Sequence, residues 1–261
     1  MKKILLLLIC VPLIGFGKNI YIPDANFKAY LVGEPLINTN GDSEIQVSEA
    51  TVFNGTIYCV NMNISDLTGI EAFTALTILY CGGNQLTSLD VSGVTSLTDL
   101  NCSLNQLTSL DVSFNTALTI LYCVGNQLTS LDISSNTALI ELYCSFNQLT
   151  NLDVNQNTLL GLFQCNGNQL TSLDVSFNTA LTDFECSSNQ LTSLDVSGAT
   201  SLTDLNCSLN QLTSLDVSFN TALTKLFCYD NKLTSLDVSN NTALTKFLYD
   251  DGTVEKKIII E

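Results

Sequence analysis

The sequence is built from a 21-residue repeat, and this period limits the chain to very few folds. Eight repeats run from Leu76 to Ala243, and each carries one cysteine at the same place, beginning with Cys81 and Cys102. Cys59 precedes this series in a less regular unit. A repeat this short cannot enclose a core of its own, so successive repeats must stack and bury each other's apolar faces. The chain is therefore predicted to be a solenoid.

Within one repeat, apolar residues alternate as they do in a β-strand. In the segment 79–81, the alternation turns Leu79 and Cys81 towards the core and Tyr80 towards solvent. The segment 89–91 alternates in the same way, which predicts a second short strand or extended run on the opposite face. Strands of successive repeats would lie side by side, about 4.8 Å apart.

The repeat resembles the leucine-rich repeat L-x-x-L-x-L-x-x-N/C-x-L. In the first regular repeat the matching residues are Leu76, Leu79, Cys81, Asn84 and Leu86. The match covers about residues 57–252, and the opening unit at 64–76 is similar to units of secreted bacterial internalin-like proteins. The whole chain is similar to repeat proteins exported by Bacteroidetes-type bacteria. That resemblance implies a right-handed leucine-rich-repeat solenoid with a parallel β-sheet along one face. It also implies a role in binding or adhesion, without fixing a ligand.

These patterns divide the chain into four segments. Residues 1–17 are interpreted as a secretory signal peptide, because two lysines precede an apolar run that ends in a small-x-small cleavage site. Residues 18–55 are predicted to form a small N-terminal cap in which Asp24 begins a short helix. The solenoid is assigned to 56–252, and 253–261 is the C-terminal tail.

Composition argues against several classes of function. Acidic residues outnumber basic residues 25 to 9, which disfavours nucleic acid and anionic lipid as partners. The chain has no histidine, the usual general base and a common metal ligand, so an enzyme is not expected. Beyond the segment 1–17, no stretch is apolar enough to insert into a membrane. The expected location is outside the cell or at its surface, with the oligomeric state open.

Three interpretations compete for the cysteine column. Metal ligands would need clustering of the C-x-x-C kind, whereas these cysteines come one per coil. A few strained disulfides would need neighbouring side chains to point at each other. The third interpretation is a column of small apolar core residues, since free cysteine is among the most buried residue types. It predicts unreactive thiols.

Two polar columns accompany the cysteines. Asparagines at the turn after each strand are predicted to hydrogen-bond backbone groups of adjacent coils. They are Asn84, Asn105, Asn126, Asn147, Asn168, Asn189, Asn210 and Asn231. The aspartates of the second column form either a solvated acidic stripe or calcium sites that screen their mutual repulsion. They are Asp90, Asp111, Asp132, Asp153, Asp174, Asp195, Asp216 and Asp237.

A loop in the cap has the spacing of a calcium site. Offsets 1, 3, 5, 7 and 12 of an EF-hand or dockerin-type loop fall on Asn38, Asn40, Asp42, Glu44 and Glu49. Asparagine replaces the first aspartate, and a serine stands where glycine makes the sharp turn. The alternative is a polar capping loop without metal.

Outward strand positions vary from coil to coil, whereas core positions hardly change. We therefore expect a protein or glycan at a cell surface to bind the exposed aromatic and apolar side chains of the strand face. The predicted ligand-binding residues are Tyr80, Ile120, Tyr122, Val124, Tyr143, Phe146, Phe227 and Tyr229. The alternative is a structural surface protein with calcium-stabilised acidic columns and no dedicated ligand.

One block of the sequence is duplicated almost without change. Residues 84–117 and 189–222 differ at a single place, Val94 against Ala199. A unique functional site would not tolerate such copying. Function is therefore expected where the copies and their neighbours differ.

Overall fold

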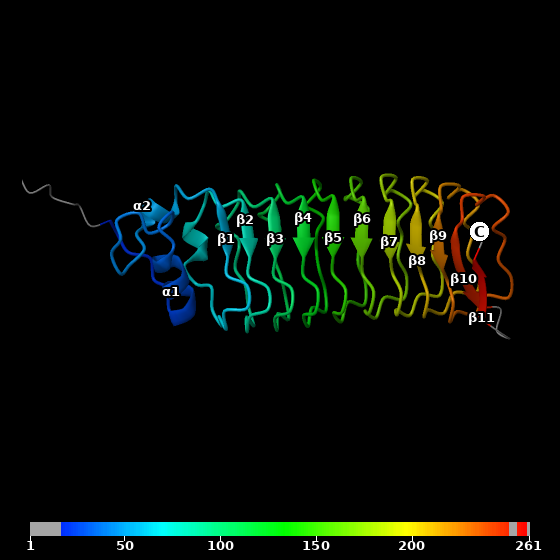
Figure 1. Cartoon of the computed structure of the whole chain (residues 1–261), viewed down its shortest axis with the longest axis horizontal. Coiled ribbons are helices and arrows are strands. Elements are labelled where there is room, and N and C mark those ends of the chain that lie inside the picture. The colour runs from blue at the N-terminus through cyan, green and yellow to red at the C-terminus, as the bar shows by residue number, and fades with distance from the viewer. Residues whose placement is uncertain (1–16, 251–254, 260–261) are drawn as a thin grey trace, which may run out of the picture.

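The computed structural model describes residues 17–250 and 255–259 of the chain. These residues form an elongated solenoid in which each 21-residue repeat makes one coil (Figure 1). The predicted leucine-rich-repeat architecture is confirmed. Apart from Gly17, the predicted signal peptide lies outside the described residues. In the part of the chain that the structure covers, no helix combines the length and apolarity needed to cross a membrane.

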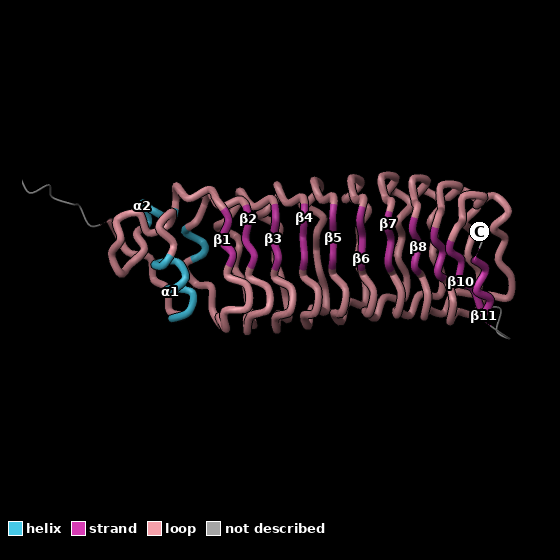
Figure 2. Tube along the Cα trace, in the orientation of Figure 1, coloured by secondary structure: helices cyan, strands magenta, loops and turns pink. Residues whose placement is uncertain are grey.

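A single sheet runs the length of the solenoid, along one side of the coils (Figure 2). Its strands pair in chain order, each in register with the strand one repeat away. The parallel strands are β1 (Thr56–Tyr58), β2 (Ile78–Tyr80), β3 (Asp99–Asn101), β4 (Ile120–Tyr122), β5 (Glu141–Tyr143), β6 (Leu162–Gln164), β7 (Asp183–Glu185), β8 (Asp204–Asn206), β9 (Lys225–Phe227) and β10 (Lys246–Asp250). Each coil thus adds three or more residues to the same face.

The strands have the predicted alternation of burial. In β4, Leu121 is fully buried, while Ile120 and Tyr122 are half-buried and face outwards. The same pattern holds from β2 to β9, and the cysteine that follows each of these strands is buried. The outward pair of each strand therefore forms a surface that we call the strand face.

On the opposite face, the second segment of each repeat is extended but forms no continuous sheet among the residues described. Isolated parallel bridges join Asp90 to Asp111 and Asp174 to Asp195. The extended run is as predicted. Between the two faces lies one continuous core, built from columns of leucine, cysteine and valine. Inside it, the rings of Phe163 and Phe184 stack with centroids 5.3 Å apart.

The cap consists of α1 (Ala25–Gly33) and α2 (Val47–Ala50), followed by the 3-10 helix η1 (Ile70–Ala72) in the first coil. Asp24 caps α1 as predicted, because its Oδ1 accepts hydrogen bonds from the backbone amides of Asn26 and Phe27, both at 2.9 Å. Its Oδ2 accepts from the backbone amide of Ser65 at 2.8 Å, which joins the cap to the first coil. Phe27 and Leu31 are fully buried.

The C-terminal tail contains a strand that sequence analysis did not predict. β11 (Glu255–Ile259) pairs antiparallel with β10 and extends the sheet by one strand. Only a short connection separates β10 from β11, so the chain reverses direction, whereas a full coil would return a parallel strand. The 21-residue period ends at this point.

Candidate functional site

The asparagine column is structural, as predicted. In a typical coil, Asn126 Nδ2 donates to the carbonyl oxygens of Cys102 and Cys123, both at 3.1 Å. Its Oδ1 accepts from the backbone amide of Leu107 at 3.0 Å. The same three bonds recur from Asn105 to Asn231. One side chain therefore satisfies backbone groups of two successive coils.

A second asparagine column was not recognised in the sequence. These side chains are buried, and each donates to carbonyl oxygens of the preceding coil. For example, Asn136 Nδ2 donates to Val112 at 3.0 Å and to Asn115 at 2.9 Å. The column comprises Asn115, Asn136, Asn157, Asn178, Asn220 and Asn241. The recurrence of asparagine every 21 residues could have revealed this column. The recurrence is interrupted at two positions, where Val94 and Ala199 replace asparagine.

The cysteine column belongs to the core. All nine cysteines of the described chain are free and buried, which agrees with the third interpretation. The thiol of Cys102 donates weakly to the Tyr122 carbonyl oxygen at 3.6 Å, and Cys144 does the same to Gln164 at 3.5 Å. Burial raises the pKa of both thiols to about 12. The thiolate, which is the reactive form, is therefore disfavoured.

The aspartate column has a local role that sequence analysis missed. Each of the eight carboxylates accepts a hydrogen bond of 2.9 Å from the backbone amide two residues later, which closes a turn. Hydrogen bonds from the serine of that turn lower the pKa of six of these carboxyls. The six are Asp90, Asp111, Asp132, Asp195, Asp216 and Asp237. These side chains remain ionised at neutral pH.

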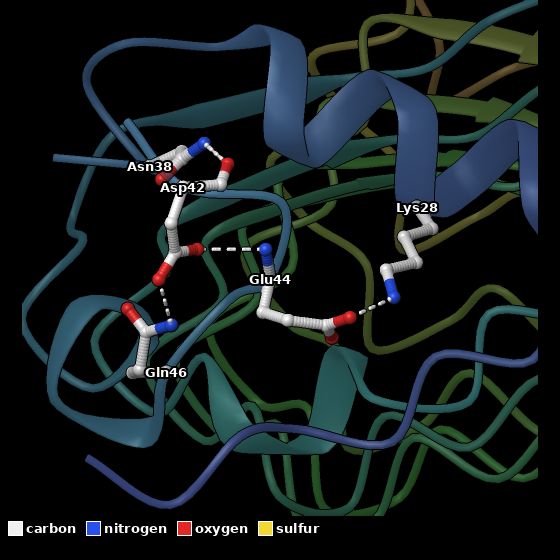
Figure 3. Close-up of polar contacts among 5 residues, drawn as sticks. All are labelled: Lys28, Asn38, Asp42, Glu44 and Gln46. Atoms are coloured by element: carbon white, nitrogen blue, oxygen red, sulfur yellow. Dashed lines mark hydrogen bonds and ion pairs between the residues drawn. The ribbon is translucent and has the colours of Figure 1, made fainter. Parts of the chain in front are cut away.

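In the cap loop, hydrogen bonds within the protein engage the oxygens that the calcium hypothesis assigns to a metal. Asp42 Oδ1 accepts from the backbone amide of Glu44 at 2.7 Å, and Oδ2 accepts from Gln46 Nε2 at 3.0 Å (Figure 3). Asn38 Nδ2 donates to the Asp42 carbonyl oxygen at 2.8 Å. Glu44 forms an ion pair with Lys28 at 2.6 Å. The loop is thus tied both to itself and to α1.

Glu49, the last residue of the calcium spacing, has a structural role in the loop. Its Oε1 accepts from the backbone amides of Thr39 and Asn40 at 2.8 and 3.2 Å, and its Oε2 accepts from the Gln46 amide at 3.0 Å. It thereby caps α2 and closes the loop. Among the described residues, no three histidine, cysteine, aspartate or glutamate side chains gather closely enough to hold a metal ion.

Calcium is expected to release no heat on titration into the whole protein at up to about 1 mM, the weak end of the range for extracellular calcium sites. The reason is that the Asp42 and Glu49 oxygens already accept hydrogen bonds. Isothermal titration calorimetry measures this directly. A saturable signal that disappears in the Asp42→Asn variant would instead place calcium in the loop.

Two tyrosines form the centre of the strand face. The rings of Tyr122 and Tyr143 stack with centroids 4.5 Å apart at an angle of 13°. The hydroxyl group of Tyr122 donates to Glu141 Oε2 at 3.1 Å, which fixes the ring. Ile120 lies on the same strand as Tyr122 and is half-buried. We call Ile120, Tyr122 and Tyr143 the tyrosine patch.

Next to this patch, the turns after the strands carry large apolar residues in a left-handed backbone conformation. Leu104 and Phe146 both have a φ of 55°, and their side chains are 66% and 60% exposed. The coil that follows each of them has a glycine at the same position. A Cβ atom on Gly125 would come within 2.9 Å of the Leu104 side chain, and one on Gly167 within 2.7 Å of the Phe146 ring. Leu104 and Phe146, the turn ridge, therefore lie over these glycines.

Further along the sheet the strand face becomes acidic. Asp183 and Asp204 are register partners on β7 and β8, and Asp204 forms an ion pair with Lys225 on β9. Desolvation raises the pKa of Asp183 and of Glu185. We call Asp183, Glu185 and Asp204 the acidic patch. A shallow depression of about 40 Å³ lies over it, bordered also by Asn206, Lys225 and Phe227.

The predicted ligand-binding residues do not form one cluster. Tyr122, Tyr143 and Ile120 lie together, with Val124 and Phe146 in the turns of the same coils. Tyr80 instead packs edge-on against Tyr58, with ring centroids 6.0 Å apart. Phe227 borders the acidic patch, and Tyr229 follows it in the turn after β9. Leu104 was not among the predicted binding residues. The duplicated block carries Leu209 at the equivalent position, so the sequence did not distinguish the two leucines.

Comparison with known proteins places these features in context. The chain is 39% identical to internalin J of Listeria monocytogenes serotype 4b (strain F2365) over 75 residues, which are 28% of this chain and 8% of that protein. The solved functional domain of InlJ from Listeria monocytogenes, which includes a cysteine ladder, matches 85% of this chain at 39% identity with a TM-score of 0.69. This chain covers 54% of that domain.

A second solved structure supports the fold. Internalin C2 of Listeria monocytogenes strain 4b F2365 matches 82% of this chain and 94% of its own length, with a TM-score of 0.67 and 19% identity. No protein-family model matches the chain. The chain thus spans about half of the solved InlJ domain and a small part of the full internalin J sequence.

Proposed function

Because this chain is an internalin-like leucine-rich-repeat solenoid, we propose that it is an exported binding module that recognises a protein or glycan partner through its strand face. The observation that carries this proposal is that the outward strand positions vary between coils while the core positions do not. Core positions and the asparagine column repeat from coil to coil, whereas the outward strand positions change chemistry from tyrosine and isoleucine on β4 to aspartate and glutamate on β7. A solenoid that only set length would not need this variation.

The tyrosine patch has the properties of a binding anchor. Stacked rings offer a large, rigid and half-exposed surface whose ordering costs little further conformational entropy on binding. The turn ridge adds two exposed apolar side chains beside it. Aromatic residues of this kind dominate the binding energy of many protein interfaces and also stack on sugar rings.

Export follows from the signal-like segment at residues 1–17 and remains part of the proposal. The competing proposal is a structural surface protein whose repeats set its length, which the duplicated block 84–117 and 189–222 favours. The two proposals differ in what they require of the strand face. Only a binding module depends on the identity of Tyr122 and Tyr143.

Replacing Tyr122 and Tyr143 together with serine is expected to weaken binding to host or bacterial surface extracts by at least about tenfold, because two aromatic anchors are lost. Binding of the purified protein to immobilised extracts measures the effect. The matched control is Phe177→Ser, which removes an aromatic ring that is 58% exposed but lies in the turn after the second extended run. Equal binding by the tyrosine variant and the wild type would refute a role for the strand face.

A further inference from the structure

The strand face combines a tyrosine-rich half, which also contains Asp99 and the Tyr122-bonded Glu141, with a more acidic half further along the sheet. The tyrosine patch occupies β4 and β5, and the acidic patch occupies β7 and β8. Between them, β6 presents Leu162 and Gln164, which are uncharged. A partner that covers both halves must therefore change from apolar to charged over a short distance.

The acidic patch has an excess of negative charge that its neighbours do not neutralise. Its three carboxylates face one ammonium group, that of Lys225, which pairs with Asp204. Within the described chain, no hydrogen-bond donor or cation contacts the carboxylate of Glu185. Its charged neighbour Asp183 is also acidic and is only partly compensated by Lys225. A cationic group would complement this patch.

The depression over the acidic patch is small and open to solvent. Its volume of about 40 Å³ holds only a few water-sized atoms. This space admits the end of one lysine or arginine side chain. Arginine in particular can donate to two carboxylates at once through its planar guanidinium group.

We propose that the strand face holds an extended basic polypeptide segment, with an apolar or aromatic anchor on the tyrosine patch and an arginine or lysine end group in the acidic patch. This inference rests on the proposed function of the strand face and names the class of its partner. β5 and β7 are two strand spacings apart, which is about 10 Å. A segment in the polyproline II conformation advances about 3.1 Å per residue and returns a side chain to the same face every third residue, so the anchor and the basic residue would stand three positions apart.

Synthetic peptides provide a direct test, because the chain contains no tryptophan. A peptide of glycine and serine with a single tryptophan three positions before a single arginine is titrated with the protein, and the anisotropy of its fluorescence is followed. Saturable binding that weakens with added salt is expected. A second peptide with glutamate in place of arginine is expected to bind roughly tenfold more weakly or not at all.

Protein variants locate the contact. The double variant Asp183→Asn/Glu185→Gln is expected to bind the arginine peptide roughly tenfold more weakly and with less dependence on salt. The matched control is Asp99→Asn, since Asp99 lies in the same local sequence as Asp204 but next to isoleucines on β2 and β4. Circular dichroism verifies that both variants are folded.

The outcomes separate this inference from the proposed function. Equal binding of the arginine and glutamate peptides, unchanged binding by the acidic-patch variant or the absence of any peptide binding would overturn the basic partner. Binding of surface extracts or neutral glycans that depends on Tyr122 and Tyr143 alone would also overturn it, while the binding function of the strand face would stand. Loss with both the acidic-patch and tyrosine variants, but not with Asp99→Asn, supports the proposal.

Discussion

Raising the pH above 9 is expected to unfold the solenoid steeply, because its buried thiols must stay protonated in the folded chain. Burial raises the pKa of Cys59, Cys102, Cys144 and Cys228 from the ordinary 9.0 to about 12. Burial also raises the pKa of the remaining five thiols, Cys81, Cys123, Cys165, Cys186 and Cys207. In the unfolded chain, the same nine groups ionise at their ordinary pKa.

The sign of the effect follows from counting protons. Above pH 9 the unfolded chain holds fewer protons than the folded chain, so rising pH favours unfolding. The stability is fully present below the ordinary thiol pKa and is lost as the pH rises towards the folded-state pKa. Each thiol contributes about half of 1.4 kcal/mol per pH unit at pH 9 and approaches the full value only at higher pH, where nine thiols together would reach about 12 kcal/mol per pH unit.

Urea unfolding followed by circular dichroism between about pH 8 and pH 9.5 measures this slope in the presence of a phosphine reductant. Tyrosine and lysine ionise mainly above about pH 10, so this window isolates the thiols. The double variant Cys123→Ala/Cys165→Ala is expected to have a slope shallower by about 1 kcal/mol per pH unit on average across this window, because the unfolded thiols are only partly ionised there. Leu128→Ala is the matched control, since it also removes buried volume but no thiol.

The control distinguishes titration from simple loss of packing. Leu128→Ala is expected to lower the free energy of unfolding at every pH and to leave its slope unchanged. A free energy of unfolding that stays constant from about pH 8 to pH 9.5 would contradict the buried-thiol explanation. Equal slopes for the cysteine variant and the wild type would contradict it as well.

The fold could be predicted from the sequence because its determinants are periodic. A strict 21-residue repeat identifies the coil, and the alternation of Ile120, Leu121 and Tyr122 identifies which side chains enter the core. Both signals are visible in the sequence without knowing which atoms of neighbouring coils contact each other. The helix cap at Asp24 is equally local, since its main partners lie two and three residues away.

Hydrogen bonds between coils were harder to predict. They depend on which backbone groups of the preceding coil lack a partner within the backbone. Asn115 donates to the carbonyl oxygens of Val91 and Val94, both in the preceding coil. In the sequence it resembles an ordinary turn residue followed by threonine. The aspartates were likewise interpreted by their charge, whereas their geometry is that of turn caps such as Asp111 with Ser113.

The candidate site was predicted only in part, because its shape depends on the neighbours of each coil. Leu104 and Leu209 occupy identical local sequences, yet Leu104 lies over Gly125, while the corresponding position after Leu209 is Asp230. Exposure differs accordingly, at 66% for Leu104 and 44% for Leu209. The stacking of Tyr122 on Tyr143 also requires that two adjacent coils carry the same residue type in register.

Removing the amide of Asn126 is expected to cost about 3 kcal/mol of folding free energy, which corresponds to a fall in Tm of roughly 6–12 °C. In Asn126→Ala the buried amide of Leu107 loses its acceptor outright. The carbonyl oxygens of Cys102 and Cys123 keep one donor each, from Asn105 and Asn147, and lose the other. Thermal unfolding by circular dichroism measures the change.

Asn126→Asp and Asn231→Ala separate the hydrogen bonds from the packing. Aspartate fills the same volume but places carboxylate oxygens against the two cysteine carbonyls, so Asn126→Asp should destabilise the fold at least as much as Asn126→Ala. Asn231 makes the same three bonds in the last regular coil, where it is partly exposed and water can replace them. Asn231→Ala should therefore cost less than half as much. Equal losses at both sites would contradict the hydrogen-bond explanation, because a lost hydrogen bond costs more where water cannot replace it.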